Sequence, residues 1–143
     1  MIRALRSDDS ARWHELWASY LAFYRGEVDD ETTGSTFERL CGRREGLFGL
    51  AGLDPDGELM GFAHCVVHPS TWSARPYCYL EDLFVDREAR GSGLARELIE
   101  AVYEEADNLG ATRVYWETQE FNSPARSLYD VVAHRTSFIV YER

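Results

Sequence analysis

Apolar and polar positions alternate in several short stretches of the chain, a pattern that predicts strands. Residues 2–6 form the first stretch, and residues 47–67 contain two apolar runs around an Asp-Pro-Asp-Gly turn, which is typical of a β-hairpin. Residues 77–87 are mostly apolar on both sides, as expected for a central strand. Residues 112–119 and the apolar stretch at 137–143 predict two further strands.

Apolar residues at helical spacing predict four helices between these strands. The first follows a cap at Ser7 or Asp8, and the second lies around residues 35–45. The third spans residues 94–109, and the fourth begins at Ser123. The apolar stripe of the first helix, which we interpret mostly as core, consists of Trp13, Leu16, Trp17, Tyr20, Leu21 and Tyr24.

The order of these elements predicts the fold class. Strands and helices are interleaved without a linker or an internal repeat, so we expect one domain over residues 1–143. The arrangement is α+β, with a mixed sheet.

Two carboxylates interrupt the predicted central strand. A carboxylate in a half-buried strand is costly unless it is paired or used, so Glu81 and Asp82 indicate function. Because Asp82 faces away from Glu81 in a regular strand, we interpret it as a structural partner. Strict alternation gives one face with Tyr77, Tyr79, Glu81, Leu83 and Val85, and another with Cys78, Leu80, Asp82 and Phe84.

The net charge of the chain limits the classes of partner that it can bind. Lys and Arg number 15 and Asp and Glu number 25, for a formal net charge of −10. No basic block is present to neutralise phosphates, so we expect no nucleic acid partner. No apolar run approaches bilayer length, and the N-terminus lacks the apolar region of a secretory signal, so we expect no membrane partner. A negative domain favours cationic small molecules or basic peptides, although the charge can equally serve solubility alone.

The cysteines and histidines indicate neither disulfides nor a metal. Cys41, Cys65 and Cys78 contain no CxxC pair, which fits a reducing, cytoplasmic environment. His64 and His68 are four residues apart, but in a strand this spacing separates the imidazoles by about 13 Å. We therefore expect no metal site.

Glycines follow the central strand where the third helix is expected to begin. Residues 90–95 read Arg-Gly-Ser-Gly-Leu-Ala. Unpaired N–H groups of a first helical turn bind anions, and glycines leave them accessible. The stretch is neither a P-loop nor a complete dinucleotide fingerprint. Loop geometry alone, or a nucleotide-binding module, are the alternatives.

Three motifs together resemble the GCN5-related N-acetyltransferase (GNAT) family. Residues 90–95 match its [Q/R]-x-x-G-x-[G/A] loop, residues 79–85 (YLEDLFV) resemble its fourth strand, and residues 122–130 (NSPARSLYD) resemble its Asn-x-x-Ala-x-x-Leu-Tyr segment. The similarity extends over about residues 58–141 and is closest in motif to enzymes that acetylate small amines or polyamines. The chain departs from the family at Ser137-Phe138, where Gly-Phe is usual.

The resemblance implies α/β/α layers, in which helices flank a mixed, mostly antiparallel sheet. It also implies acetyl-CoA as the acetyl donor and assigns its contacts. The glycine loop then holds the pyrophosphate, the strand backbone pairs with the pantetheine arm, and Asn122 contacts that arm. The backbone N–H near Leu83 polarises the thioester carbonyl. The implied residues are Leu83, Phe84, Val85, Arg90, Gly91, Ser92, Gly93, Leu94, Ala95, Asn122, Ala125 and Tyr129.

Acetyl transfer to an amine needs a proton acceptor and a proton donor. Glu81 is the candidate base, directly or through water, because partial burial raises the pKa of a carboxyl group. Tyr129 is the candidate acid for the departing sulfur, since a phenol is a neutral donor. The alternative is that Tyr129 is a core residue on the apolar face of its helix.

The acceptor is the least specified part of the prediction. Aromatic and acidic side chains bind ammonium groups, which favours a small cationic primary amine. Basic protein tails, or a non-catalytic acetyl-CoA-binding module, are the alternatives. The family resemblance also implies a homodimer, in which the C-terminal strand pairs across the interface. The candidate acceptor contacts are Tyr24, Glu27, His64, Trp72 and Glu81, with Asp29, Asp30 and Glu31 in the same acidic loop as Glu27.

Overall fold

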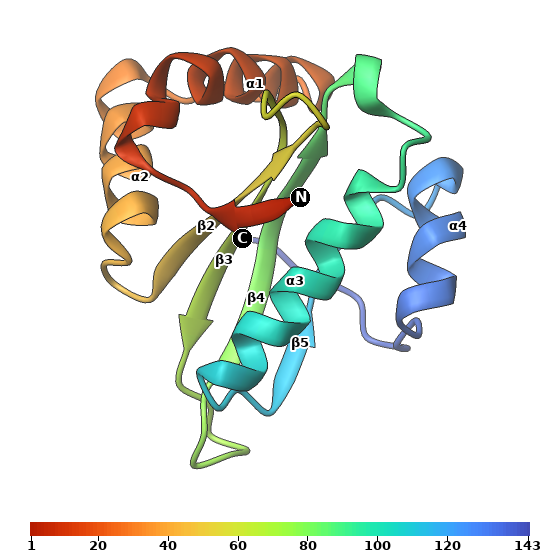
Figure 1. Ribbon diagram of the computed structural model, residues 1–143. Coiled ribbons are helices and arrows are strands. Elements are labelled where there is room, and N and C mark those ends of the chain that lie inside the picture. Colours follow the sequence, from red (N-terminus) through yellow and green to blue (C-terminus); the bar gives the residue numbers. More distant parts are fainter.

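A five-stranded sheet forms the centre of the computed structural model, which describes residues 1–143 (Figure 1). The strands lie in the order β1-β2-β3-β4-β5, antiparallel from β1 to β4, with β5 parallel to β4. The predicted mixed, mostly antiparallel sheet is confirmed. The strands are β1 (Ile2–Ala4), β2 (Leu47–Leu53), β3 (Leu59–His68), β4 (Tyr77–Val85) and β5 (Arg113–Tyr115).

The turn between β2 and β3 forms where the sequence predicts it. Asp54 Oδ1 accepts hydrogen bonds from the amides of Asp56 and Glu58, both at 2.9 Å. Gly57 has a φ of +86°, a conformation that glycine adopts without strain. The side chain of Asp54 and the glycine therefore fix the hairpin and the register of the two strands.

Helices cover both faces of the sheet (Figure 1). On one face α1 (Ser10–Phe23) and α2 (Asp30–Gly42) bury a core that includes Trp13, Leu16 and Phe62. On the other face α3 (Leu94–Asn108) packs on the strands, and α4 (Ser123–Val132) lies against α3. None of the helices combines the length and apolar character needed to cross a bilayer.

The second helix begins earlier than predicted, because the acidic residues before it cap its N-terminus. Asp29 is the N-cap and accepts a hydrogen bond from the Thr32 amide at 2.6 Å. Asp30 and Glu31 occupy the first turn, where negative charge is favourable. The predicted acidic loop is therefore largely a helix terminus.

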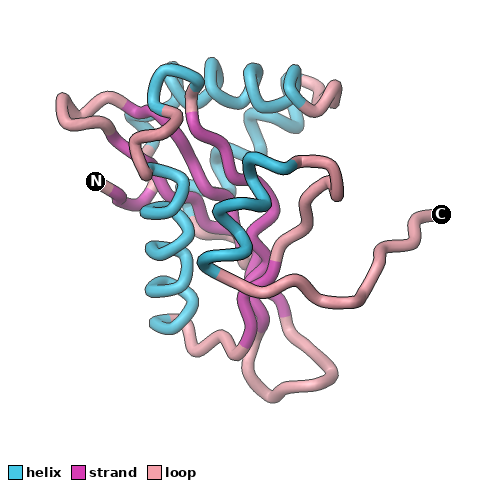
Figure 2. The backbone as a smooth tube through the Cα atoms, turned by 90° about the vertical axis from the view of Figure 1, so that its right-hand side faces the viewer, coloured by secondary structure: helices cyan, strands magenta, loops and turns pink.

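The C-terminal part of the chain differs most from the sequence prediction. Residues 137–143 do not form the expected strand, and residues 133–143 extend from the body of the protein (Figure 2). The predicted strand at 112–119 is limited to Arg113–Tyr115. Apolar residues form a strand only where a strand edge pairs with them, and residues 137–143 meet no edge within this chain.

Candidate active site

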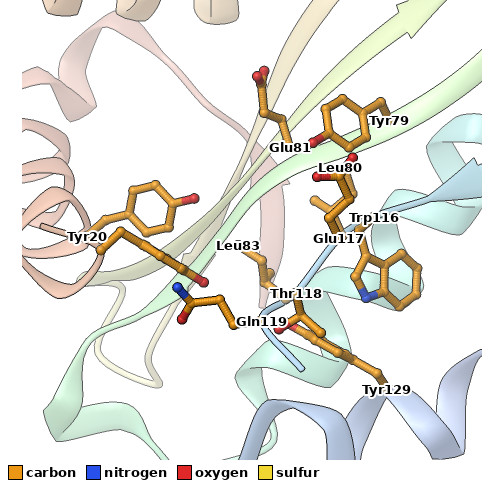
Figure 3. Close-up of a pocket in the computed structure, with 11 residues that line it drawn as sticks. Tyr20, Tyr79, Leu80, Glu81, Leu83, Trp116, Glu117, Thr118, Gln119 and Tyr129 are labelled. Carbon is orange, nitrogen blue, oxygen red and sulfur yellow. The ribbon is translucent and has the colours of Figure 1, made fainter. Parts of the chain in front are cut away.

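The cleft lies where β4 and β5 separate. The two strands pair from Tyr77–Arg113 to Tyr79–Tyr115 and no further. Beyond this point β4 continues to Val85 without a partner on that edge. A cleft of about 300 Å³ opens there (Figure 3), lined by Tyr20, Tyr24, Tyr79, Leu80, Glu81, Leu83, Trp116, Glu117, Thr118, Gln119 and Tyr129.

A β-bulge places Glu81 at this cleft. His64 of β3 pairs with Asp82, whereas the next residue, Cys65, pairs with Leu80. Glu81 is therefore the extra residue of the bulged strand and has no partner on β3. Bulges re-aim side chains and recur next to active sites.

The bulge reverses the alternation of β4, so the predicted division of its faces is wrong beyond Leu80. Before the bulge, Leu80 packs in the core beneath α3. After it, Leu83 packs in that same core, while Phe84 contacts the core beneath α1 and α2. Asp82 likewise points towards α1, where it accepts a hydrogen bond from Tyr20. Asp82 is therefore a structural partner of other side chains, as predicted, but it lies on the α1 side of the sheet and not on the side of Leu80.

Partial burial tunes Glu81 for proton transfer. Desolvation raises the pKa of its carboxyl group, and the negative charges of Asp82 and Glu117 raise it further. The positive charge of Arg39 on α2 opposes this shift. A carboxylate with a raised pKa is a stronger base than an ordinary surface glutamate.

His64 does not contact the cleft as predicted. Its side chain is 2% exposed and lies inside the α1 core. The ring accepts a hydrogen bond from Trp13 Nε1 at 2.9 Å, and its Nδ1 lies 2.9 Å from Asp82 Oδ2. The side-chain alternation of β3 turns His64 away from the neighbouring Cys65, and therefore into this core.

Tyr129 reaches the cleft from α4. Pro124 lies in the first turn of that helix, as predicted, although Asn122 rather than Ser123 is its N-cap. Tyr129 packs edge-on against Trp116, with ring centroids 5.4 Å apart. Burial raises the pKa of its hydroxyl group to about 12. Like an ordinary tyrosine, Tyr129 is protonated at neutral pH and can donate its proton.

The glycine loop exposes the backbone at the start of α3. Gly91 and Gly93 have φ angles of +79° and +89°, and no atom lies within 4 Å of a Cβ placed on either. The amides of Gly91, Gly93 and Ala95 have no hydrogen-bond partner in the protein. Arg90 is exposed beside them. The loop thus combines free N–H donors, a helix N-terminus and a positive charge, which together fit a pyrophosphate.

The remaining predicted contacts divide into two groups. Tyr24 lines the cleft, and Asn122 lies at its rim, where the side-chain amide donates to Thr118 at 3.5 Å. Glu27 and Trp72 are exposed and do not line the cleft; Trp72 is 91% exposed in the loop between β3 and β4. Neither residue is an acceptor contact in this structure.

Sequence reasoning gave no site role to seven residues that line the cleft. Tyr20 belongs to the aromatic stripe of α1, and its hydroxyl group was the available sign that it is more than a core residue. Tyr79 and Leu80 precede Glu81 on β4. The other four follow β5, in a segment where neither periodicity nor a motif marks a function: Trp116, Glu117, Thr118 and Gln119.

Comparison with known proteins agrees with this geometry. Residues 12–131 match the acetyltransferase (GNAT) family. The chain belongs to the GNAT family. It is therefore an N-acetyltransferase, and the resemblance stated from the sequence is confirmed.

Individual GNAT proteins are similar over most or all of the chain. The D-amino-acid N-acetyltransferase HPA3 of Saccharomyces cerevisiae is 35% identical, over 100% of this chain and 89% of its own length. A thialysine N-epsilon-acetyltransferase of Caenorhabditis elegans is 34% identical over 61% of this chain and 51% of its own. The structure of AAC(6')-Iy with a CoA-based bisubstrate analog has the same fold, with a TM-score of 0.85 at 21% identity, covering 100% of this chain and 96% of that one.

Proposed function

We propose that this GNAT protein transfers an acetyl group from acetyl-CoA to the primary amine of a small cationic molecule. The observation that carries the proposal is the cleft itself, which brings together Glu81, Glu117 and Tyr129 and is lined by no Lys or Arg. Carboxylates in a cleft that no Lys or Arg lines attract an ammonium group. The relatives named above act on D-amino acids and on thialysine, which are both amines.

The chain offers acetyl-CoA a continuous set of contacts. The free amides of the glycine loop and the guanidinium of Arg90 suit the pyrophosphate. The unpaired edge of β4, which includes Leu83, Phe84 and Val85, offers backbone groups to an extended pantetheine arm. Ser92, Leu94 and Ala95 form the loop and the helix start, and Asn122 and Ala125 lie at the start of α4. Acetyl-CoA supplies the acetyl group as a thioester.

Two side chains of the cleft then transfer protons: Glu81 accepts one and Tyr129 donates one. Glu81 takes a proton from the ammonium group, directly or through water, so that the nitrogen lone pair becomes available. The amine attacks the thioester directly, and no covalent enzyme adduct is needed. Tyr129, whose phenol is protonated at neutral pH, protonates the departing sulfur.

An amine panel tests the proposal. Thiol release from acetyl-CoA is measured with polyamines, D- and L-amino acids, aminoglycosides and a basic peptide. We expect the highest kcat/KM for small amines with a net positive charge, because Glu81 and Glu117 attract the ammonium group. Tight acetyl-CoA binding without turnover on any amine would instead support the non-catalytic binding module, and preference for the peptide would identify a protein acetyltransferase.

We also propose that the protein is a homodimer that uses its C-terminal segment. Four consecutive apolar side chains are exposed there: Phe138 (84%), Ile139 (74%), Val140 (69%) and Tyr141 (88%). Such a segment gains stability by pairing with the open edge of a sheet in a second copy. Light scattering is expected to give twice the chain mass, and an Ile139→Asp/Val140→Asp variant is expected to be monomeric. A monomeric wild-type protein would contradict the proposal.

A cytoplasmic location is a further proposal. Cys65 and Cys78 lie on adjacent strands, are fully buried, and remain free thiols. This chemistry is compatible with a reducing compartment. Fractionation of cells that express the protein tests it, and recovery outside the cytoplasm would contradict it.

A further inference from the structure

A chain of hydrogen bonds beneath the cleft begins at a buried tryptophan and ends at a tyrosine of the cleft. Trp13 Nε1 donates to His64 Nε2 at 2.9 Å, and His64 Nδ1 lies 2.9 Å from Asp82 Oδ2. The other carboxylate oxygen of Asp82 accepts from the Tyr20 hydroxyl at 2.8 Å. Trp13 is 0% exposed, whereas Tyr20 lines the cleft. The chain runs from α1 through β3 and β4 and back to α1.

The direction of every bond in this chain follows from its first donor. An indole N–H donates and cannot accept, so His64 Nε2 must be the accepting nitrogen. The ring proton of a neutral imidazole then lies on Nδ1, from which it is donated to Asp82. Both oxygens of Asp82 therefore act as acceptors.

The hydroxyl group of Tyr20 therefore donates its only hydrogen to Asp82. Burial and the neighbouring charge of Asp82 raise the pKa of Tyr20, so the phenol keeps this hydrogen. The Tyr20 oxygen can then form further hydrogen bonds only through its lone pairs, as an acceptor. Towards the cleft, Tyr20 is thus an acceptor of hydrogen bonds and not a donor.

We propose that Tyr20 binds the nitrogen of the acceptor amine by accepting an N–H hydrogen bond, and that Asp82, His64 and Trp13 are positioning residues that fix this polarity. The inference rests on the proposed N-acetyltransferase function. An accepting oxygen holds the amine by its hydrogens and leaves the nitrogen lone pair free to attack. A hydroxyl that donated to the nitrogen would occupy that lone pair and block the reaction.

Tyr103 provides the control. Its hydroxyl donates to the Val132 carbonyl at 2.8 Å and does not line the cleft. A Tyr103→Phe variant therefore removes a tyrosine hydroxyl from the protein without altering the hydrogen-bond chain that ends at Tyr20.

The test is a double-mutant cycle read as amine KM at saturating acetyl-CoA. In Asp82→Asn the amide can accept from His64 and donate to Tyr20, which turns the hydroxyl hydrogen towards the cleft. We expect Asp82→Asn and Tyr20→Phe each to raise the amine KM about 10- to 100-fold, as for loss of a hydrogen bond to a charged group. At a pH above the acidic limb, where Glu81 is deprotonated in every variant, the double variant is expected to match the single variants, because both act on the amine through one bond. The KM for acetyl-CoA of these variants, and the amine KM of Tyr103→Phe, are expected to change less than threefold.

The outcomes separate this inference from the proposed function. If the wild-type protein acetylates no amine, both fail. If it acetylates amines and Tyr20→Phe leaves the amine KM unchanged, the inference is overturned and the function stands. If the effects of Asp82→Asn and Tyr20→Phe multiply in the double variant, Asp82 does not act through Tyr20, which also overturns it. Circular dichroism checks that each variant folds. If Asp82→Asn does not fold, the amine KM of Tyr20→Phe alone tests the inference.

Discussion

Asp82 follows Glu81 at the bulge of β4, and burial together with the charge of Asp82 raises the pKa of the Glu81 carboxyl group. The two residues therefore have different tasks. Asp82 is tied to Tyr20 and His64, whereas Glu81 lies in the cleft without a fixed partner. This division suits a base whose strength is set by a neighbouring anion.

The first prediction concerns the pH dependence of kcat/KM for the amine. Only the deprotonated Glu81 accepts a proton, so activity is lost as the pH falls through its pKa. Because that pKa is raised, the acidic limb is expected above the ordinary range of a glutamate. Asp82→Asn removes one cause of the shift and is expected to move the limb to lower pH. A limb that stays in place in this variant would exclude Asp82 as the tuning charge.

The second prediction assigns the base by substitution. Glu81→Gln keeps the size of the side chain and removes its proton affinity, so kcat is expected to fall about 10²- to 10⁴-fold. Glu117→Gln is the matched control, since it removes the same charge from the same cleft. It is expected to raise the amine KM and to retain most of kcat. Equal losses of kcat in both variants would contradict the assignment of Glu81.

The third prediction concerns Tyr129. Tyr129→Phe removes the proton donor, and kcat is expected to fall about 10²-fold or more while acetyl-CoA still binds. Tyr103 offers a control on α3, because its hydroxyl donates to the Val132 carbonyl and lies outside the cleft. Rapid-mixing kinetics of both variants distinguish lost chemistry from lost folding. Full activity of Tyr129→Phe would instead support the alternative that Tyr129 is a core residue on the apolar face of its helix.

The fourth prediction concerns the glycine loop. Arg90→Ala is expected to weaken acetyl-CoA binding about tenfold, because a charge-assisted bond is lost, and to leave the amine KM unchanged. Arg87→Ala is the control, since Arg87 is an exposed arginine in the short 3-10 helix just before the loop. Calorimetric titration with acetyl-CoA measures both. Normal affinity in Arg90→Ala would favour the alternative that the glycines serve loop geometry alone.

The fifth prediction concerns stability. Arg3 donates to both carboxylate oxygens of Asp9 at 2.8 Å, and this pairing lowers the pKa of Asp9. A carboxylate with a lowered pKa in the folded state stabilises the protein above its unfolded-state pKa, and loses that effect as the pH falls through the folded value. Asp9→Asn is expected to lower the free energy of unfolding by about 1–3 kcal/mol at neutral pH, and less in acid.

Urea denaturation across pH measures this difference. Asp8→Asn is the control, because Asp8 is exposed and makes no hydrogen bond through its side chain. An Asp9→Asn effect that is the same at neutral and acidic pH would contradict the role of the ion pair.

The sequence predicted best what depends on local spacing. The Asp54–Gly57 turn, the start of α3 after Gly93 and the helix that carries Tyr129 all follow from neighbouring residues. Family membership followed from the same short motifs. These features do not depend on how distant strands align.

The features that the sequence did not predict depend on distant partners. The bulge at Glu81 is a mismatch between β3 and β4, and strict alternation cannot reveal it. For that reason Asp82 was placed on the wrong face. Similarly, the apolar pattern at 137–143 predicts a strand correctly only if a strand edge is available, and no edge of this chain pairs with it.

The most direct test of the central claim is thiol release from acetyl-CoA with the best amine of the panel, measured for the wild-type protein, Glu81→Gln and Tyr129→Phe. We expect amine-dependent turnover by the wild-type protein and at least a 10²-fold lower kcat in each variant. If both variants release thiol at the wild-type rate, the cleft between β4 and β5 does not carry out acetyl transfer through these two residues.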